Sequence, residues 1–262
     1  MWRAVAGAFK KQIFMKEKIA EIVRKSNNRV DICISLIETF GLSNVAELGV
    51  YRGEFAKKVL EKSQCIEKYT MIDPWRNLEA WNKPANTDNE TFEQFYQETI
   101  EKTDFARGKR IVLRGKTTEV VSEIQDNSLD LVYIDGDHTL KGISVDLISM
   151  WPKVKENGFI AGDDFCPSIW QHSQEFEPSL VFPFAVYFAE AVHARIYALP
   201  YGQFVIWKQR AGVFEFTDLT SGMYSNTELG SQLIVGEKKS EPVMKKRVPF
   251  AGKVISFLNR WL

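Results

Sequence analysis

Cysteine is scarce in this chain and never occurs in a metal-binding or disulfide pattern. The 262 residues include three cysteines, Cys33, Cys65 and Cys166, and no C-x-x-C pair. An odd number of widely spaced cysteines fits neither a disulfide framework nor a zinc ribbon. We therefore expect free thiols in a reducing compartment.

An excess of charge of either sign is also missing. The 34 Lys and Arg residues balance 34 Asp and Glu residues. Such a balance does not supply the positive field that sequence-independent binding to nucleic acid needs. We expect no nucleic-acid partner.

Long apolar runs are absent as well. No segment approaches the roughly 18 to 20 apolar residues of a membrane-spanning helix. The short apolar patch in residues 1–9 is broken by Lys10 and Lys11, so it lacks the longer apolar stretch and the cleavage site of a secretory signal. The prediction is a cytoplasmic protein.

What the sequence does contain is an alternation of short β-rich runs with helical stretches. Residues 1–43 are assigned to an N-terminal helical segment, because apolar residues recur at helical spacing within residues 12–41. The alternation that follows is typical of a parallel sheet with helices on both faces. The predicted strands are 44–48, 69–73, 110–114, 129–135, 159–161, 195–199 and 203–207. The predicted helices between them run through Leu60, over about 89–101, 118–124 and 140–150, and to an end near His193.

The fold class is therefore α/β: a doubly wound, Rossmann-like domain over residues 44–208. Its seven strands are predicted to be mostly parallel, and the last two form an antiparallel hairpin at the edge, joined by a turn at 200–202. The remaining residues, 209–262, lose the α/β rhythm and end in a basic amphipathic segment over 245–262. This appendage could pack on the domain, join a second copy in a homo-oligomer, or make peripheral contact with a membrane.

Acidic residues stand at the carboxyl ends of four predicted strands, the edge where open α/β sheets bind ligands. They are Glu47, Asp73, Asp135 and the pair Asp163 and Asp164.

The turn after the first strand predicts an adenosine-containing cofactor. Gly49 and Gly53 allow backbone to pass close to a ligand, and Asp73 at the end of the second strand could accept hydrogen bonds from ribose hydroxyls. These features fit both S-adenosylmethionine and NAD. The acid Glu47 and the lack of a G-x-G-x-x-G motif favour S-adenosylmethionine, because a pyrophosphate would be repelled by a carboxylate there.

Three blocks of the sequence resemble the class I S-adenosylmethionine-dependent methyltransferases. They are Ala46-Glu47-Leu48-Gly49-Val50-Tyr51-Arg52-Gly53 with Ile72-Asp73-Pro74, then Tyr133-Ile134-Asp135-Gly136-Asp137-His138, and Gly158-Phe159-Ile160-Ala161-Gly162-Asp163-Asp164. The last two look like the metal-dependent sugar O-methyltransferases of macrolide and aminocoumarin biosynthesis and related glycan-tailoring enzymes. The resemblance implies that the cofactor is bound by Glu47, Gly49, Tyr51, Gly53, Asp73, Gly115, Lys116, Thr117 and Asp135.

The same resemblance implies that Asp135, Asp163 and Asp164 bind a divalent cation. Neighbouring strands lie about 4.8 Å apart, so acids at their ends converge and repel one another unless they are protonated or bridged by a cation. Oxygen ligands suit Mg²⁺, Mn²⁺ or Ca²⁺.

The predicted function is O-methylation of a small acceptor, a sugar or another vicinal diol. A hydroxyl must lose its proton to attack a sulfonium, and His138 or Asp137 is the predicted base. Aromatic residues in two loops could stack on the acceptor or simply close the domain: Trp75, Trp81, Trp170, His172 and Phe176. Two alternatives stay open, a non-catalytic scaffold that binds S-adenosylmethionine and an NAD-dependent oxidoreductase.

Overall fold

The computed structural model describes residues 2–210 and 212–224, and for residues 2–11 the backbone alone. The predicted basic amphipathic segment of the appendage lies outside these residues. None of the described helices is long and apolar enough to cross a membrane.

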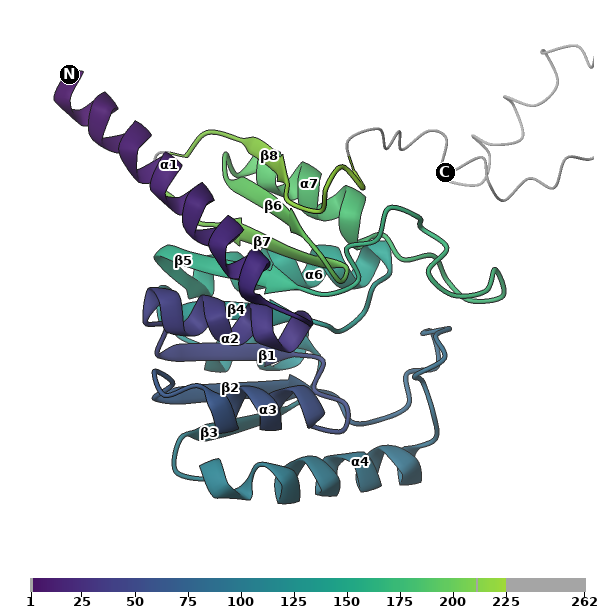
Figure 1. Cartoon of the computed structure of the whole chain (residues 1–262). Coiled ribbons are helices and arrows are strands. Elements are labelled where there is room, and N and C mark those ends of the chain that lie inside the picture. Colours follow the sequence, from purple (N-terminus) through teal and green to yellow (C-terminus); the bar gives the residue numbers. More distant parts are fainter. Residues whose placement is uncertain (1, 211, 225–262) are drawn as a thin grey trace, which may run out of the picture.

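One mixed eight-stranded sheet forms the centre of the described chain (Figure 1). Its strands, in chain order, are β1 (Asn44–Leu48), β2 (Lys68–Asp73), β3 (Arg110–Arg114), β4 (Leu129–Ile134), β5 (Val154–Gly162), β6 (Arg195–Leu199), β7 (Gln203–Trp207) and β8 (Glu215–Asp218). In the sheet the order is β3-β2-β1-β4-β5-β7-β6-β8. The strands from β3 to β5 are parallel, whereas β7 is antiparallel to both of its neighbours. The predicted doubly wound, Rossmann-like α/β fold is confirmed.

Helices cover both faces of the sheet. They are α1 (Trp2–Lys25), α2 (Arg29–Phe40), α3 (Glu54–Lys62), α4 (Asn89–Lys102), α5 (Thr117–Val120), α6 (Leu140–Met150) and α7 (Val181–Ala191). Short 3₁₀ turns occur at Asp104–Ala106, Val121–Glu123 and Trp151–Lys153. The first three helices share one apolar core with one face of the sheet, and α5, α6 and α7 share a second core with the other.

The strand count exceeds the prediction by one, because β8 was missed. This strand pairs with β6 in parallel and occupies the edge, so the β6–β7 hairpin is not the edge of the sheet as predicted. With four residues in a segment rich in Thr, Ser and Gly, β8 is too short to give a period-2 signal of its own. The hairpin itself is confirmed, and its turn residues Tyr201 and Gly202 both have the positive φ that such tight turns need.

Strand β5 begins earlier than predicted. Asn157 and Gly158 were expected to form a loop before the strand, but both lie inside it. Asn157 takes a positive φ of 68° and its N–H donates to the carbonyl of Lys208, while the pairing with β4 shifts register between Leu129 and Leu131. The Asn-Gly pair, which usually marks a turn, therefore lies within an irregular part of the strand.

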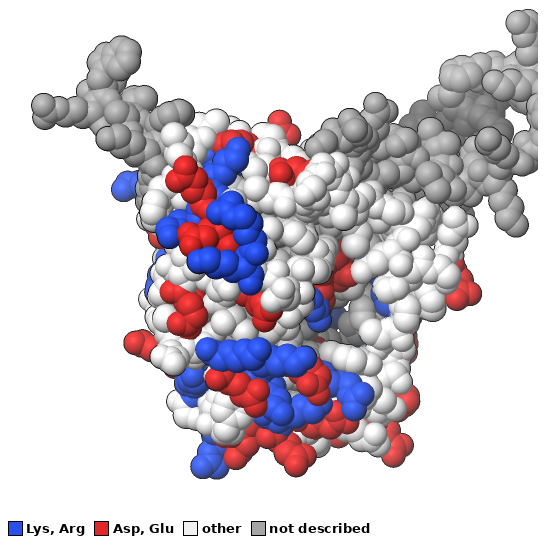
Figure 2. All heavy atoms as spheres, in the orientation of Figure 1, with Lys and Arg blue, Asp and Glu red and all other residues white. Residues whose placement is uncertain are grey.

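Charged side chains of both signs are mixed on the face shown in Figure 2. Lys and Arg alternate there with Asp and Glu and form no broad patch of one sign, as the balanced composition predicts.

Candidate active site

The order of strands reverses between β1 and β4, and this switch point is where doubly wound sheets bind ligands. Backbone hydrogen bonds continue past the strand ends: Asp135 N donates to the carbonyl of Leu48 at 2.8 Å, and Asp163 N to that of Ile134 at 2.9 Å. The turns after β1, β4 and β5 are therefore held side by side.

The turn after β1 needs glycine for steric reasons. Gly49 has a φ of +85°, and a Cβ atom there would overlap the backbone carbonyl of Asp135. Gly53 has a φ of +72°, and its Cβ would lie 2.9 Å from the side chain of Thr99. Gly49 thus lets the end of β4 approach the turn, while Gly53 lets the turn approach α4.

Asp73 braces this turn through its carboxylate. One oxygen accepts the backbone N–H groups of Val50 and Tyr51 at 2.9 and 2.8 Å, and the other accepts that of Trp75 at 2.7 Å. Burial raises the pKa of Asp73, and the three N–H donors oppose that rise. Asp73 therefore serves the turn directly, and its contact with a ribose stays a prediction.

Glu47 is buried below the turn rather than exposed in it. Its side chain is 1% exposed and accepts the hydroxyl of Tyr69 at 2.6 Å. Burial raises the pKa of Glu47 to about 8, so the group is mostly neutral at pH 7. A neutral Glu47 does not provide the repulsion of a pyrophosphate on which the sequence argument against NAD depended.

The segment after β3 is hydrogen-bonded to the end of β2, which supports the turn. Gly115 N donates to the carbonyl of Asp73 at 3.0 Å, and Lys116 caps α5, its N–H bonded to Glu119 at 2.9 Å. Thr117 donates its hydroxyl to Asp146 at 2.5 Å. Burial raises the pKa of Asp146 to about 7. Asp146 was missed from the sequence because it lies within α6 and belongs to no strand end.

Three potential metal ligands converge at the ends of β4 and β5. Asp135, His138 and Asp164 each place a ligand atom within 4.8 Å of the other two. His138 Nε2 lies 2.6 Å from Asp164 Oδ2 and 3.9 Å from Asp135 Oδ1. We call these three residues the acid cluster. Two carboxylates and an imidazole form a donor set that suits a divalent cation, so the residues present fit the predicted metal.

The two carboxyls of the acid cluster have different pKa shifts. Burial raises the pKa of Asp135, although the positive charge of Arg29 acts against that rise. Burial would also raise the pKa of Asp164, but its hydrogen bond to His138 and the charge of that group lower it overall. Asp164 is therefore the carboxylate that stays ionised most readily.

Asp163, the third predicted ligand, points to different partners. One of its oxygens accepts from Gln203 Nε2 at 2.5 Å and from Asp164 N at 2.9 Å, and the other is ion-paired with Arg29. Arg29 Nη1 also lies 2.7 Å from Asp135 Oδ2. Sequence analysis missed Arg29, because it is the first residue of α2 and lies far along the chain from either strand end.

The comparisons with known proteins fit this geometry. Residues 46–165, which include the turn after β1 and the acid cluster, match a protein family described as a methyltransferase domain. The chain contains an S-adenosylmethionine-dependent methyltransferase domain. No curated protein matches the chain in sequence.

Solved structures share the fold of this methyltransferase domain. A protein assigned as a caffeoyl-CoA O-methyltransferase from Staphylococcus aureus superposes with a TM-score of 0.52 at 15% identity, covering 79% of this chain and 98% of its own. Cofactor-bound Rv0187 from MTB superposes with a TM-score of 0.50 at 13% identity, covering 80% and 91%. At these identities the likeness shows the fold alone. The family match decides against the NAD-dependent oxidoreductase.

Two loops of the methyltransferase domain meet beside the acid cluster. Trp81 Nε1 donates to Asp137 Oδ1 at 3.0 Å, and Lys83 Nζ donates to the carbonyl of Glu177 at 2.6 Å. Asp137 Oδ1 also accepts the N–H of Thr139 at 3.0 Å. This oxygen of Asp137 is thus taken up by structural hydrogen bonds, which leaves His138 as the better candidate for a base.

The aromatic residues of the two loops differ in their burial and in their contacts. Trp75 is fully buried, and its Nε1 donates to the carbonyl of Tyr51 at 2.7 Å, so it closes the domain rather than overhanging an acceptor. His172 and Phe176 are in ring contact with a centroid distance of 6.3 Å. Trp170 has a buried indole N–H without a hydrogen-bond partner in the described structure.

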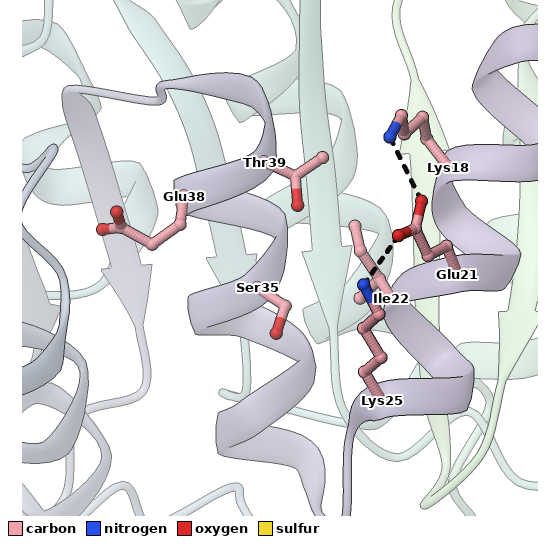
Figure 3. A pocket seen from close by; sticks show the side chains of 7 residues that line it. All are labelled: Lys18, Glu21, Ile22, Lys25, Ser35, Glu38 and Thr39. Atoms are coloured by element: carbon pink, nitrogen blue, oxygen red, sulfur yellow. Dashed lines mark hydrogen bonds and ion pairs between the residues drawn. The ribbon is translucent and has the colours of Figure 1, made fainter.

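A groove of about 210 Å³ lies elsewhere, between α1 and α2 (Figure 3). Glu21 points into it between Lys18 and Lys25 and pairs with both, at 3.1 and 2.7 Å. None of the predicted site residues lines this groove. The acid cluster therefore remains the candidate active site.

Proposed function

We propose that the methyltransferase domain transfers a methyl group to a hydroxyl of a sugar or another vicinal diol, assisted by a divalent cation such as Mg²⁺. The observation that supports this most is the convergence of Asp135, His138 and Asp164 within 4.8 Å. This cluster adjoins the turn after β1, because Gly49 packs directly against the backbone of Asp135. Cofactor and acceptor would thus meet at one point.

Asp135 and Asp164 would hold the cation. When bound there, it would polarise the two adjacent hydroxyls of a diol and lower their pKa. Asp163 contributes to the same region through its ion pair with Arg29 rather than through the cluster itself.

His138 would accept the proton of the attacking hydroxyl. Because the carboxylate of Asp164 accepts from Nε2, the neutral ring carries its lone pair on Nδ1. Nδ1 is buried and has no hydrogen-bond partner in the described part of the chain. S-adenosylmethionine bound beside the cluster would supply the methyl group, and His138 would take the proton that the acceptor hydroxyl loses.

Alignment of oxygen, carbon and sulfur would supply most of the rate, since the sulfonium is already a good leaving group. The turn built from Gly49, Tyr51, Gly53 and the carboxylate of Asp73 would hold the cofactor for this alignment. Lys116 and Thr117 would contact the adenosine from the segment after β3.

A transfer assay with methyl-labelled S-adenosylmethionine tests the proposal. The acceptors are methyl glycosides with a vicinal diol, catechol, and matched deoxy or monohydroxy analogues, each with EDTA, with Mg²⁺, or with EDTA followed by excess Mg²⁺. We expect label on diols alone, loss with EDTA and recovery with Mg²⁺. Equal labelling of monohydroxy analogues, unchanged by EDTA, would refute both the diol and the metal.

A further inference from the structure

Arg29 places a permanent positive charge against the acid cluster from a distant part of the sequence. It is the first residue of α2, and the side chain of Asn28 caps that helix by accepting the N–H of Asp31. Arg29 Nη1 lies 2.7 Å from Asp135 Oδ2 and is also ion-paired with Asp163. The N-terminal helical segment thus contributes a charged group to the candidate active site.

The two oxygens of Asp135 face different partners. Oδ2 is bonded to Arg29, whereas Oδ1 lies 3.9 Å from His138 Nε2, on the side of Asp164. A cation held by Asp135 and Asp164 would therefore share one carboxylate with the guanidinium. The guanidinium of Arg29 and a divalent cation bound to the same carboxylate would repel each other, and the repulsion is stronger where the carboxylate is partly buried.

The side chain of Arg29 is not enclosed at this position. Its side chain is 38% exposed, and its guanidinium lies 5.5 Å above the ring of Phe55. Its positive charge is permanent, because a guanidinium does not lose its proton in a protein. The residue therefore neutralises carboxylates of the site in the described structure, and its exposed part has room to move toward solvent.

We infer that Arg29 is a resident cation that competes with the divalent metal at Asp135 and so weakens metal binding. The inference rests on the proposed function, because it takes the acid cluster to be a metal site. Its consequence is a site that is neutralised in the absence of metal and exchanges metal readily.

The test is titration of Mn²⁺ by isothermal calorimetry into the wild-type full chain and into Arg29→Met, both saturated with S-adenosylhomocysteine. Methionine keeps the length of the side chain and removes the charge. We expect Arg29→Met to bind Mn²⁺ about tenfold more tightly or better, since it removes a charge beside the site. Arg24→Met is the matched control, because Arg24 is exposed on α1 and should leave the affinity unchanged.

A second readout is thermal unfolding. Without metal, Arg29→Met should unfold at a lower temperature than the wild type, because the carboxyls of Asp135 and Asp163 lose their ion-pair partner. Saturating Mn²⁺ should restore more stability to the variant than to the wild type.

The outcomes separate the two proposals. Equal or weaker Mn²⁺ binding by Arg29→Met, with the wild type binding normally, overturns the role of Arg29 and leaves the metal site standing. Absence of Mn²⁺ binding in both proteins, with S-adenosylhomocysteine still bound, overturns the metal-assisted function and the competition with it.

Discussion

The turn after β1 and the acid cluster lie next to each other. The turn is stabilised by residues close to it in the sequence, whereas the acid cluster is stabilised by a residue from a distant segment. The turn is held by Asp73 and Trp75, which are 22 to 24 residues away from Val50 and Tyr51. The acid cluster is neutralised by Arg29, which is 106 residues from Asp135. Contacts within one βαβ unit follow from the local pattern of the sequence, whereas a counter-charge from a separate segment does not.

Substitutions in the turn and in the acid cluster should therefore change different properties of the protein. The largest expected effect comes from replacing the predicted base, His138. We expect His138→Gln to lower kcat by about 10² to 10⁴, because the attacking hydroxyl loses its proton acceptor. Affinity for S-adenosylhomocysteine, measured by calorimetry, should stay within about twofold, since the turn after β1 is untouched.

Mn²⁺ affinity of the same variant distinguishes two roles of His138. A base leaves Mn²⁺ binding nearly intact, whereas a metal ligand loses it together with activity. Loss of both would assign His138 to the metal and leave the base to be found.

Glycine substitutions in the turn come next in size. A Cβ at position 49 would overlap the carbonyl of Asp135, so Gly49→Ala should displace the end of β4 and weaken binding of both S-adenosylhomocysteine and Mn²⁺, each by about tenfold or more. Gly53→Ala crowds Thr99 of α4 rather than the end of β4, and it should weaken binding of S-adenosylhomocysteine but not of Mn²⁺. Identical effects of the two variants would show that the turn and the acid cluster form one inseparable unit.

The last comparison concerns stability rather than binding, through Glu47 beneath the turn. Burial raises its pKa to about 8, above the ordinary value of 4.5, so the folded state binds a proton that the unfolded state releases between these values. Stability should be greatest below about pH 4.5 and should fall as pH rises toward 8, by at most about 1.4 kcal/mol per pH unit from this group.

Glu47→Gln should remove that dependence while its amide oxygen still accepts from Tyr69. Urea unfolding of both proteins between pH 5 and 8 measures the difference in slope. Parallel curves would show that Glu47 is ionised in the folded protein.

Much of the fold could be predicted because each β-strand and its following turn carry a local signal. Strands β1, β3, β6 and β7 have the predicted bounds, and the acids that end β1, β2, β4 and β5 were found from the sequence. The fourth strand ends at Ile134, one residue before the predicted Asp135. Strand β8 and the early start of β5 were missed, since their pairing comes from neighbours in space rather than from periodicity.

The acidic residues of the candidate site were predicted from the sequence, but the residues that they contact were not. Asp135 and Asp164 meet His138, which had been assigned only as a base, and Asp163 meets Arg29 and Gln203 instead. Which oxygen faces which partner depends on the packing of α2 against the sheet, and no spacing within the sequence encodes that.

The most direct test of the account is the metal dependence of the acid cluster. Mn²⁺ is titrated by electron paramagnetic resonance into the wild type and into Asp164→Asn, each with S-adenosylhomocysteine bound, and Asp126→Asn is the control because Asp126 lies on the surface in an ion pair with Lys153. We predict that the wild type and Asp126→Asn bind one Mn²⁺ per chain and that Asp164→Asn binds at least tenfold more weakly while keeping the cofactor product. Equal Mn²⁺ binding by all three proteins, or none by the wild type, would contradict a metal-assisted methyl transfer at Asp135 and Asp164.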